Sequence, residues 1–126
     1  LVRALQKHVQ EVTKTGLNVV LETNYYQQQP FEVEESLFRI SQEALNNVQK
    51  HAQSSTVWLR LESRAESVHL SIQDNGVGFI VQQAVKRESA IGLKSMRERA
   101  EAVGASFEVV SEIGQGTTLD VQLLRS

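Results

Sequence analysis

The sequence predicts an α+β fold, a two-layer α/β sandwich in which helices cover one face of a mostly antiparallel sheet. The main observation is the order of the apolar patterns, which runs β, α, β, β, α, β, β after an N-terminal helix. A second observation is that the sequence is uniform along its length. The 126 residues contain no repeat and no change of composition, so we expect one domain over residues 1–126.

In the N-terminal half, helical spacing and strand-like runs follow one another. Apolar residues at helical spacing predict a helix over 1–15 with Gly16 as its stop, and a β-branched run predicts a strand over 17–23. The clearest helical pattern spans 33–51. Its apolar side consists of Leu37, Ile40, Ala44, Leu45 and Val48.

In the C-terminal half, two alternating runs at 57–61 and 68–72 predict neighbouring antiparallel strands with one buried face. A glycine-containing turn follows, and the polar stretch 80–90 predicts a mobile loop. The remaining elements are a helix ended by Gly104 and two strands, expected at 93–103, 107–110 and 117–124.

Composition places the chain among ordinary globular domains. Its 13 basic and 15 acidic residues give a formal net charge of -2, which supplies no electrostatic basis for binding nucleic acid or an anionic membrane. The absence of cysteine excludes disulfides and thiolate metal sites. No apolar run approaches the roughly 20 residues of a membrane span. Together these properties lead us to expect a cytoplasmic domain, and the start at Leu1 without a methionine suggests that it is excised from a larger protein.

The helix predicted over 33–51 has a polar flank beside its apolar side. Glu43 and Asn47 stand four residues apart and therefore stack on one side, with Arg39 and Lys50 on the same flank. A carboxylate, a carboxamide oxygen and cations together suggest a Mg-phosphate site, because Mg²⁺ prefers hard oxygen ligands. An ordinary solvated face explains this helix equally well.

Asp74 begins a glycine-containing turn, 74–79, directly after an apolar strand. Its two glycines let the backbone approach a ligand closely, and a buried carboxylate requires a donor such as the exocyclic amine of adenine. The alternative is a plain strand-to-loop turn, because Asp-Asn-Gly is common turn chemistry. No GxxxxGK[ST] segment occurs, which excludes a P-loop.

Gly92 and Leu93 open the next predicted helix, whose free N–H groups favour phosphate oxygens. The helix also contains Lys94, Arg97 and Arg99, although basic side chains at such a position commonly face water alone. The segment 114–119 is a hairpin turn, in which a threonine can also donate to a phosphate.

The order and spacing of four segments are together specific. These segments are 43–52 (EALNNVQKHA), 74–79 (DNGVGF), 92–100 (GLKSMRERA) and 114–117 (GQGT). They resemble the N box and glycine boxes of the ATP-binding domain of sensor histidine kinases, which belongs to the GHKL superfamily of gyrase, mismatch-repair and chaperone ATPases. The first and third segments are similar to the nitrate-sensor and desaturase-thermosensor subgroup. The resemblance extends over about residues 15–124 and implies the Bergerat, or GHKL, ATP-binding fold.

For the nucleobase, the resemblance implies that Asp74 reads the adenine amine, with help from a bound water and Thr117. It implies that Gly76 and Gly78 let the backbone wrap around the base.

For the phosphates, the resemblance implies that Asn47 ligates the Mg²⁺ that bridges them. Lys50 and His51 would lie near the phosphates or the ribose, although a structural role in packing fits His51 equally well. Gly92 and Leu93 would end the lid over the nucleotide and present N–H groups to the phosphates.

Glu43 matches the position that activates water in the hydrolysing relatives. In this subgroup the resemblance implies support of the metal site or of proton transfer, so Glu43, Asn47 and Lys50 are the candidate catalytic residues. Ala90 departs from the family pattern, because many relatives have there the first glycine of a Gly-x-Gly pair.

The resemblance implies a protein-histidine kinase that uses ATP and Mg²⁺ and acts in a two-component system with a response regulator. The phosphoacceptor histidine would lie on a separate dimerisation domain, because none of the three histidines, His8, His51 and His69, fits the role of phosphoacceptor. We therefore expect a monomeric fragment that cannot phosphorylate itself, from a homodimeric parent whose membrane anchoring stays open. Two alternatives stay open, a stand-alone anti-sigma-factor-type serine kinase and a non-catalytic nucleotide-sensing module.

Overall fold

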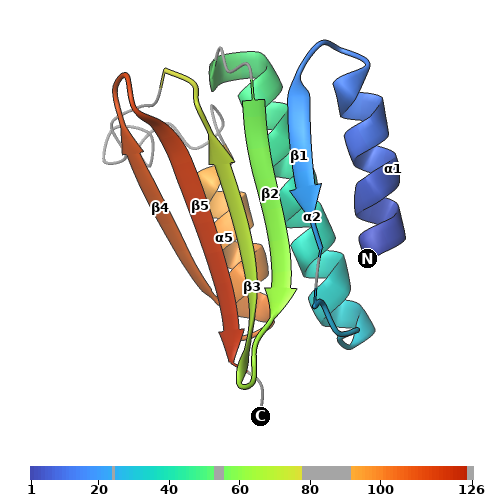
Figure 1. Ribbon diagram of the computed structural model, residues 1–126. Helices are drawn as coiled ribbons and strands as arrows, with labels where there is room; N and C mark the ends of the chain where they lie inside the picture. The colour runs from blue at the N-terminus through green and yellow to red at the C-terminus, as the bar shows by residue number, and fades with distance from the viewer. Residues whose placement is uncertain (24, 53–55, 78–91, 125–126) are drawn as a thin grey trace.

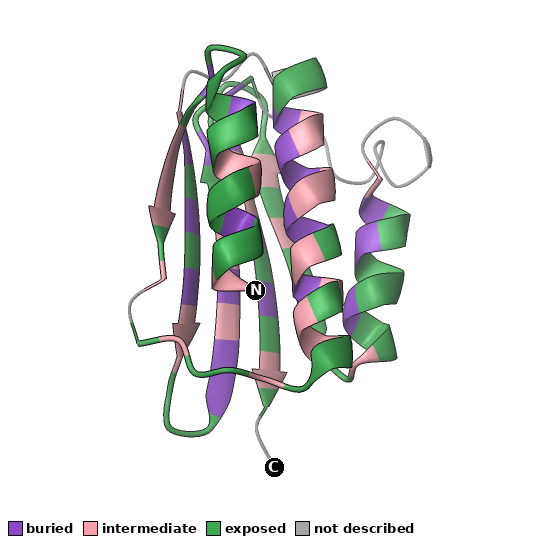
Figure 2. Cartoon of the chain, turned by 90° about the vertical axis from the view of Figure 1, so that its right-hand side faces the viewer, coloured by how far each residue is buried: buried purple, intermediate pink, exposed green. Residues whose placement is uncertain are grey.

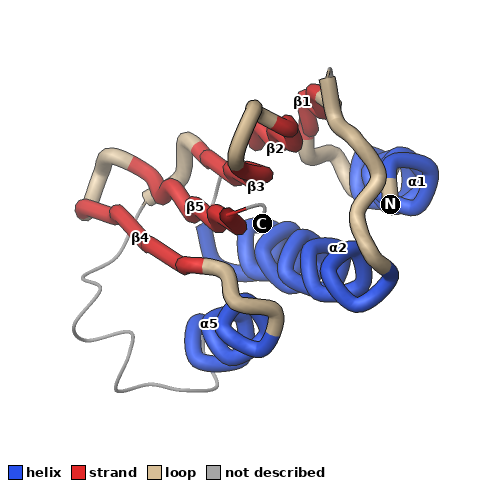
Figure 3. The backbone as a smooth tube through the Cα atoms, turned by 90° about the horizontal axis from the view of Figure 1, so that it is seen from below, coloured by secondary structure: helices blue, strands red, loops and turns tan. Residues whose placement is uncertain are grey.

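The structure, a computed structural model, describes residues 1–23, 25–52, 56–77 and 92–124. This part of the chain has two layers, a five-stranded sheet and the helices that lie on one face of it (Figures 1 and 3). The predicted α+β sandwich is confirmed. In chain order, the elements are α1 (Val2–Thr13), β1 (Asn18–Glu22), α2 (Phe31–Asn47), the short π-helix η1 (Val48–Ala52), β2 (Thr56–Ser63), β3 (Ser67–Asp74), α5 (Leu93–Ala102), β4 (Ser106–Glu112) and β5 (Gly116–Leu124).

The strand order in the sheet is β1-β2-β3-β5-β4. The pair β1–β2 is parallel and the other three pairs are antiparallel, which agrees with the prediction of a mostly antiparallel sheet. Parallel neighbours need a crossover connection, and α2 supplies it. Helix α2 therefore runs along the sheet from the end where β1 finishes to the end where β2 starts (Figure 1).

The core lies between the sheet and the helices, and Figure 2 shows the buried residues on the sides that face each other. On β2, Val57, Leu59 and Leu61 are fully buried and alternate with more exposed residues, as the period of a half-buried strand requires. The five apolar residues predicted for the inner side of the helix over 33–51 are all buried, four of them on α2 and the fifth, Val48, at the start of η1.

The helix predicted over 33–51 differs from the observed α2 at both ends. Helix α2 begins at Phe31, directly after Pro30, whose fixed φ suits a helix start. Its α-helical part ends at Asn47 rather than at residue 51, because residues 48–52 form the π-helix η1. Gly104 is confirmed as the stop of α5. It has a φ of 79°, and the N–H groups of Gly104 and Ala105 donate to the last carbonyls of the helix.

Several predictions fall outside the described residues. They concern the loop at 80–90, Gly78, Ala90 and the side chain of His51. Among the helices that the structure describes, none combines the length and the apolar character that crossing a bilayer requires.

Candidate functional site

The predicted site residues that the structure describes gather at one end of the molecule. The C-terminal ends of α2 and β3 and the N-terminal ends of α5 and β5 meet there, at the top of Figure 1. Segments that are far apart in the sequence thus come together at this end.

A row of residues crosses the inner face of the sheet at this end. The register pairs Asp74 with Val57 on β2 and with Thr117 on β5, and Thr117 in turn pairs with Ser111 on β4. Asp74 is only 7% exposed, and its Oδ1 accepts a hydrogen bond of 2.7 Å from the N–H of Gly76. A buried carboxylate thus stands directly opposite a hydroxyl at the end of the sheet.

Ser111 is a polar member of this row that the sequence analysis missed. Its Oγ lies 2.8 Å from Oγ1 of Thr117 and donates to the carbonyl oxygen of Gly116 at 3.1 Å. The predicted strand stopped at Val110, whereas β4 continues to Glu112. The signal that could have found Ser111 is the tight hairpin turn, because its geometry fixes which residues of the two strands stand opposite.

The turn after Asp74 is attached to its neighbours on two sides. Asn75 donates its N–H to the carbonyl of Thr56 at 3.3 Å, and its side-chain Oδ1 accepts the N–H of Thr56 at 3.1 Å. On the other side, the N–H of Gly114 donates to the carbonyl of Val77 at 2.6 Å. These bonds fix the position of Gly76, which is buried between them.

Gly116 approaches the backbone of Asp74 so closely that a side chain cannot fit. It has a φ of 81°, and a Cβ at this position would overlap the carbonyl oxygen of Asp74. Glycine is therefore required at the start of β5 both by backbone conformation and by space.

The end of α2 and the start of α5 are in direct contact through Glu43. Gly92, the N-cap of α5, has a φ of 63°, and the side-chain carboxylate of Glu43 occupies the space that a Cβ of Gly92 would need. Asn47, one turn further along α2, is half-buried beside this contact. The negative end of one helix dipole thus lies beside the positive end of another.

Two other residues predicted to lie near the phosphates, Leu93 and Lys50, are not part of the contact between Glu43 and Gly92. Leu93 is buried in the core, so only its backbone is available to a ligand. Lys50 is exposed and belongs to η1. Because a π-helix turns by less per residue than an α-helix, an α-helical wheel no longer fixes the position of Lys50 relative to Glu43 and Asn47.

Tyr26, Glu34 and His69 have clearly shifted pKa values. Burial and the hydrogen bond to Glu34 raise the pKa of Tyr26 well above its usual range. Burial alone would raise the pKa of Glu34, but hydrogen bonds from the Tyr26 hydroxyl and the Gln29 N–H lower it. Burial lowers the pKa of His69, and the charge of Arg64 lowers it further.

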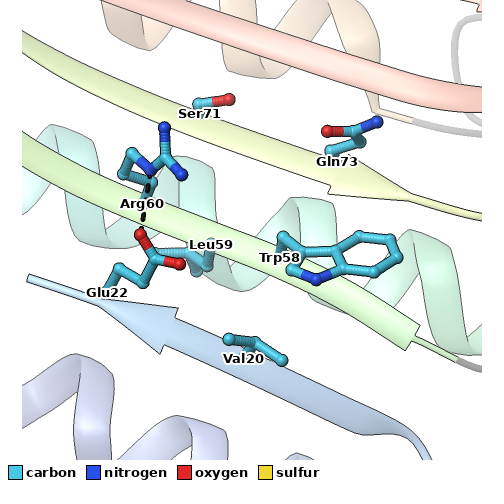
Figure 4. Close-up of a pocket in the computed structure, with 7 residues that line it drawn as sticks. All are labelled: Val20, Glu22, Trp58, Leu59, Arg60, Ser71 and Gln73. Atoms are coloured by element: carbon cyan, nitrogen blue, oxygen red, sulfur yellow. Dashed lines mark hydrogen bonds and ion pairs between the residues drawn. The ribbon is translucent and has the colours of Figure 1, made fainter.

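Two cavities formed by described residues are separate from the row that contains Asp74. One, of about 280 Å³, lies on the outer face of the sheet beside Trp58 and the ion pair between Arg60 and Glu22 (Figure 4). The other, of about 470 Å³, lies beside Tyr25 and Arg64. Neither cavity is lined by a predicted nucleotide-binding residue.

The fold and the gathered motifs together define a class, an ATPase domain built as an α+β sandwich. Residues 32–126 match the family model described as histidine kinase-, DNA gyrase B-, and HSP90-like ATPase. This chain therefore belongs to that ATPase family. Among the described residues, no group of three or more His, Cys, Asp or Glu side chains gathers that could hold a metal ion by itself.

Similar proteins agree with this assignment. The chain is 45% identical over 93 residues to the sensor protein VraS of Staphylococcus saprophyticus and 43% identical to VraS of Staphylococcus aureus, in each case over 74% of this chain and 26% of the relative. The chain therefore spans about a quarter of the length of these curated relatives.

Solved structures show the same fold at low sequence identity. A histidine kinase domain of the blue-light-activated histidine kinase of Erythrobacter litoralis superposes with a TM-score of 0.77 at 20% identity, over 94% of this chain and 56% of that one. The histidine kinase AdeS of Acinetobacter baumannii gives 0.77 at 11% identity, over 98% of this chain and 64% of that one. The chain thus shares its fold with these histidine kinase domains.

Proposed function

We propose that residues 1–126 form the Mg-ATP-binding catalytic domain of a two-component sensor histidine kinase. In this proposal the domain positions ATP so that its γ-phosphoryl group passes to a histidine on a separate dimerisation domain. The observation that supports it most directly is the buried Asp74 carboxylate, opposite Thr117, at the end of the molecule where α2 and α5 meet.

Asp74 is the proposed reader of adenine. A carboxylate that is 7% exposed needs donors, and the Gly76 N–H supplies one to its Oδ1. The exocyclic amine of adenine is a suitable further donor, and Thr117 stands directly opposite to assist. Gly76 and Gly78 are the proposed positions where the backbone passes close to the base.

Asn47 and Glu43 are the proposed residues of the Mg-phosphate side. The amide oxygen of Asn47 and the carboxylate of Glu43 are hard oxygen donors, which suits Mg²⁺ held mainly by phosphates and waters. When bound, the ion would neutralise phosphate charge. The N–H groups at Gly92 and Leu93 begin α5 and would bind phosphate oxygens, with Lys50 and His51 beside the phosphates or ribose.

The transfer step requires positioning and neutralisation of charge more than covalent help from the protein. Glu43 would support the metal site or the movement of a proton from the acceptor. The parent would be a homodimer whose phosphohistidine is read by a response regulator, whereas the chain itself would be monomeric and unable to phosphorylate itself.

The first experiment is calorimetric titration of ATP into the chain with and without Mg²⁺. We expect saturable binding with Kd between about 1 μM and 1 mM, the usual range for such substrates. Asp74→Asn should weaken it at least about tenfold, because a charge-assisted hydrogen bond to a buried group is lost and an acceptor becomes a donor. Asp120→Asn, the same change at an exposed position of β5, is the matched control.

A second variant distinguishes the adenine side of the proposed site from its Mg-phosphate side. Asn47→Asp should alter the dependence of ATP binding on Mg²⁺ while leaving the affinity for adenosine unchanged. If Asp74→Asn and Asp120→Asn both bind Mg-ATP like the parent chain, the assignment of Asp74 is wrong. Absence of ATP binding in the parent chain would favour a non-catalytic module.

Substrate choice separates the proposal from its closest alternative. The chain should phosphorylate a supplied histidine-bearing dimerisation fragment, and the product should be labile in acid because it is a phosphohistidine. An acid-stable phosphoprotein would instead indicate an anti-sigma-factor-type serine kinase. Sedimentation should show a monomer, and a dimer independent of concentration would contradict that part.

A further inference from the structure

The hydroxyl of Ser111 contacts both Gly116 and Thr117, which lie next to Asp74, the proposed adenine reader. It stands next to Thr117 in the row across the sheet, and Thr117 stands next to Asp74. Its hydroxyl oxygen contacts Oγ1 of Thr117 at 2.8 Å and the carbonyl oxygen of Gly116 at 3.1 Å. Ser111 is therefore one residue removed from Asp74 along this row.

The available protons decide the direction of these hydrogen bonds. A carbonyl oxygen can only accept, so the single hydroxyl proton of Ser111 is donated to Gly116. The contact between the two hydroxyls then requires Thr117 to donate its own proton to Ser111. Thr117 consequently presents only lone pairs to any further partner.

We propose that Ser111 is a specificity-determining residue that turns the Thr117 hydroxyl into a hydrogen-bond acceptor. Asp74 and Thr117 then form a pair of acceptors on directly opposite positions of β3 and β5. Side chains at such positions have Cβ atoms about 4.5–5.5 Å apart, close enough to serve one ligand group, directly or through an ordered water.

Two neighbouring acceptors select a purine by the group at position 6. An exocyclic amine has two N–H donors and matches them, whereas a 6-oxo group is itself an acceptor and offers them no donor. Rejection of a ligand that leaves buried polar groups unpaired is the stronger form of specificity. This inference rests on the proposed function, because it assumes that Asp74 reads the base.

Without Ser111, the same threonine has a free proton. Its hydroxyl can then rotate and donate to a 6-oxo group or to Asp74 itself. Loss of Ser111 should therefore reduce the discrimination between the two kinds of purine more than it reduces the binding of nucleotide as such.

The test compares ATP with inosine triphosphate, which has an oxygen where ATP has the amine. The quantity measured is the ratio of the two Kd values, from calorimetric titrations into the 126-residue chain. Ser111→Ala should lower this ratio about three- to tenfold, the effect of one hydrogen bond. Ser111→Thr keeps the hydroxyl and should keep the ratio. Ser106→Ala is the matched control, since Ser106 lies on the same strand at an exposed position.

Ser111→Cys makes the test independent of folding of the alanine variant, because a thiol fills the volume but is a weak donor and acceptor. It should lower the ratio as alanine does. A cysteine or alanine variant that binds both nucleotides with the parent ratio overturns the role of Ser111. Failure of the proposed function looks different, since Asp74→Asn would then leave ATP binding unchanged.

Discussion

Gly116→Ala is expected to destabilise the chain more than alanine at another left-handed glycine. Gly104 and Gly116 have nearly equal φ values, 79° and 81°. At Gly104 no atom of the described residues beyond its chain neighbours lies within 4 Å of the added Cβ, so this variant measures the cost of conformation alone. At Gly116 the added Cβ would overlap the main-chain carbonyl of Asp74.

The expected magnitudes follow from these two environments. A left-handed alanine costs roughly 1 to 2 kcal/mol in free energy of unfolding, which is the expected loss for Gly104→Ala. Gly116→Ala adds a clash with backbone that is hydrogen-bonded between β2 and β5 and cannot rotate away. Overpacking of this kind costs a further 1 to 3 kcal/mol, roughly, so we expect a total loss of about 3 kcal/mol.

The assay is urea unfolding of the parent chain and both variants, analysed by linear extrapolation with the slopes compared. ATP titration of the same samples should show weaker binding for Gly116→Ala alone, because the clash displaces Asp74. Equal losses of stability in the two variants would refute the argument from the Asp74 carbonyl.

Two further predictions concern Gly92 and Glu34. Gly92→Ala should lower the free energy of unfolding more when Glu43 is present than in a Glu43→Ala background, because the Glu43 carboxylate occupies the space of the new Cβ. A double-mutant cycle of unfolding free energies measures this difference, and additive effects would contradict the contact. The lowered pKa of Glu34 means that its contribution to stability is complete above its ordinary value of 4.5 and is lost as pH falls. Tyr26→Phe removes a donor to Glu34 and raises that pKa, so unfolding free energy should depend less on pH between about 5 and 3, and an unchanged pH profile would contradict the hydrogen bond.

Much of the fold was predictable because apolar periodicity reports which side of an element is buried. The inner residues of α2 and the alternating runs of β2 and β3 all lie where their spacing indicates. Gly104 ends α5 because a left-handed residue without a Cβ is a local requirement that sequence records directly.

Other features depend on contacts between distant segments and leave no local signal. The change from α- to π-helix after Asn47 is one, since the same apolar side continues through Val48. The parallel pairing of β1 with β2 is another, because strand alternation does not reveal the neighbour. Ser111 escaped notice because its importance comes from the register that places it beside Thr117.

The same limit applies to the candidate site. Sequence spacing predicted that Glu43 and Asn47 share a flank of α2, and they do. It did not predict that the carboxylate of Glu43 touches Gly92, because that contact depends on how two helices pack. The roles of these residues in binding Mg-ATP stay predictions.

The outward position of Trp58 has a practical consequence. It is the single tryptophan of the chain, and on β2 it alternates with residues of the inner face, next to Val57, which pairs with Asp74. Its indole is thus separated by the sheet from the proposed nucleotide site and is 41% exposed. Its fluorescence should therefore follow unfolding at any nucleotide concentration, so that stabilisation by a ligand can be measured through an optical signal that the ligand itself does not touch.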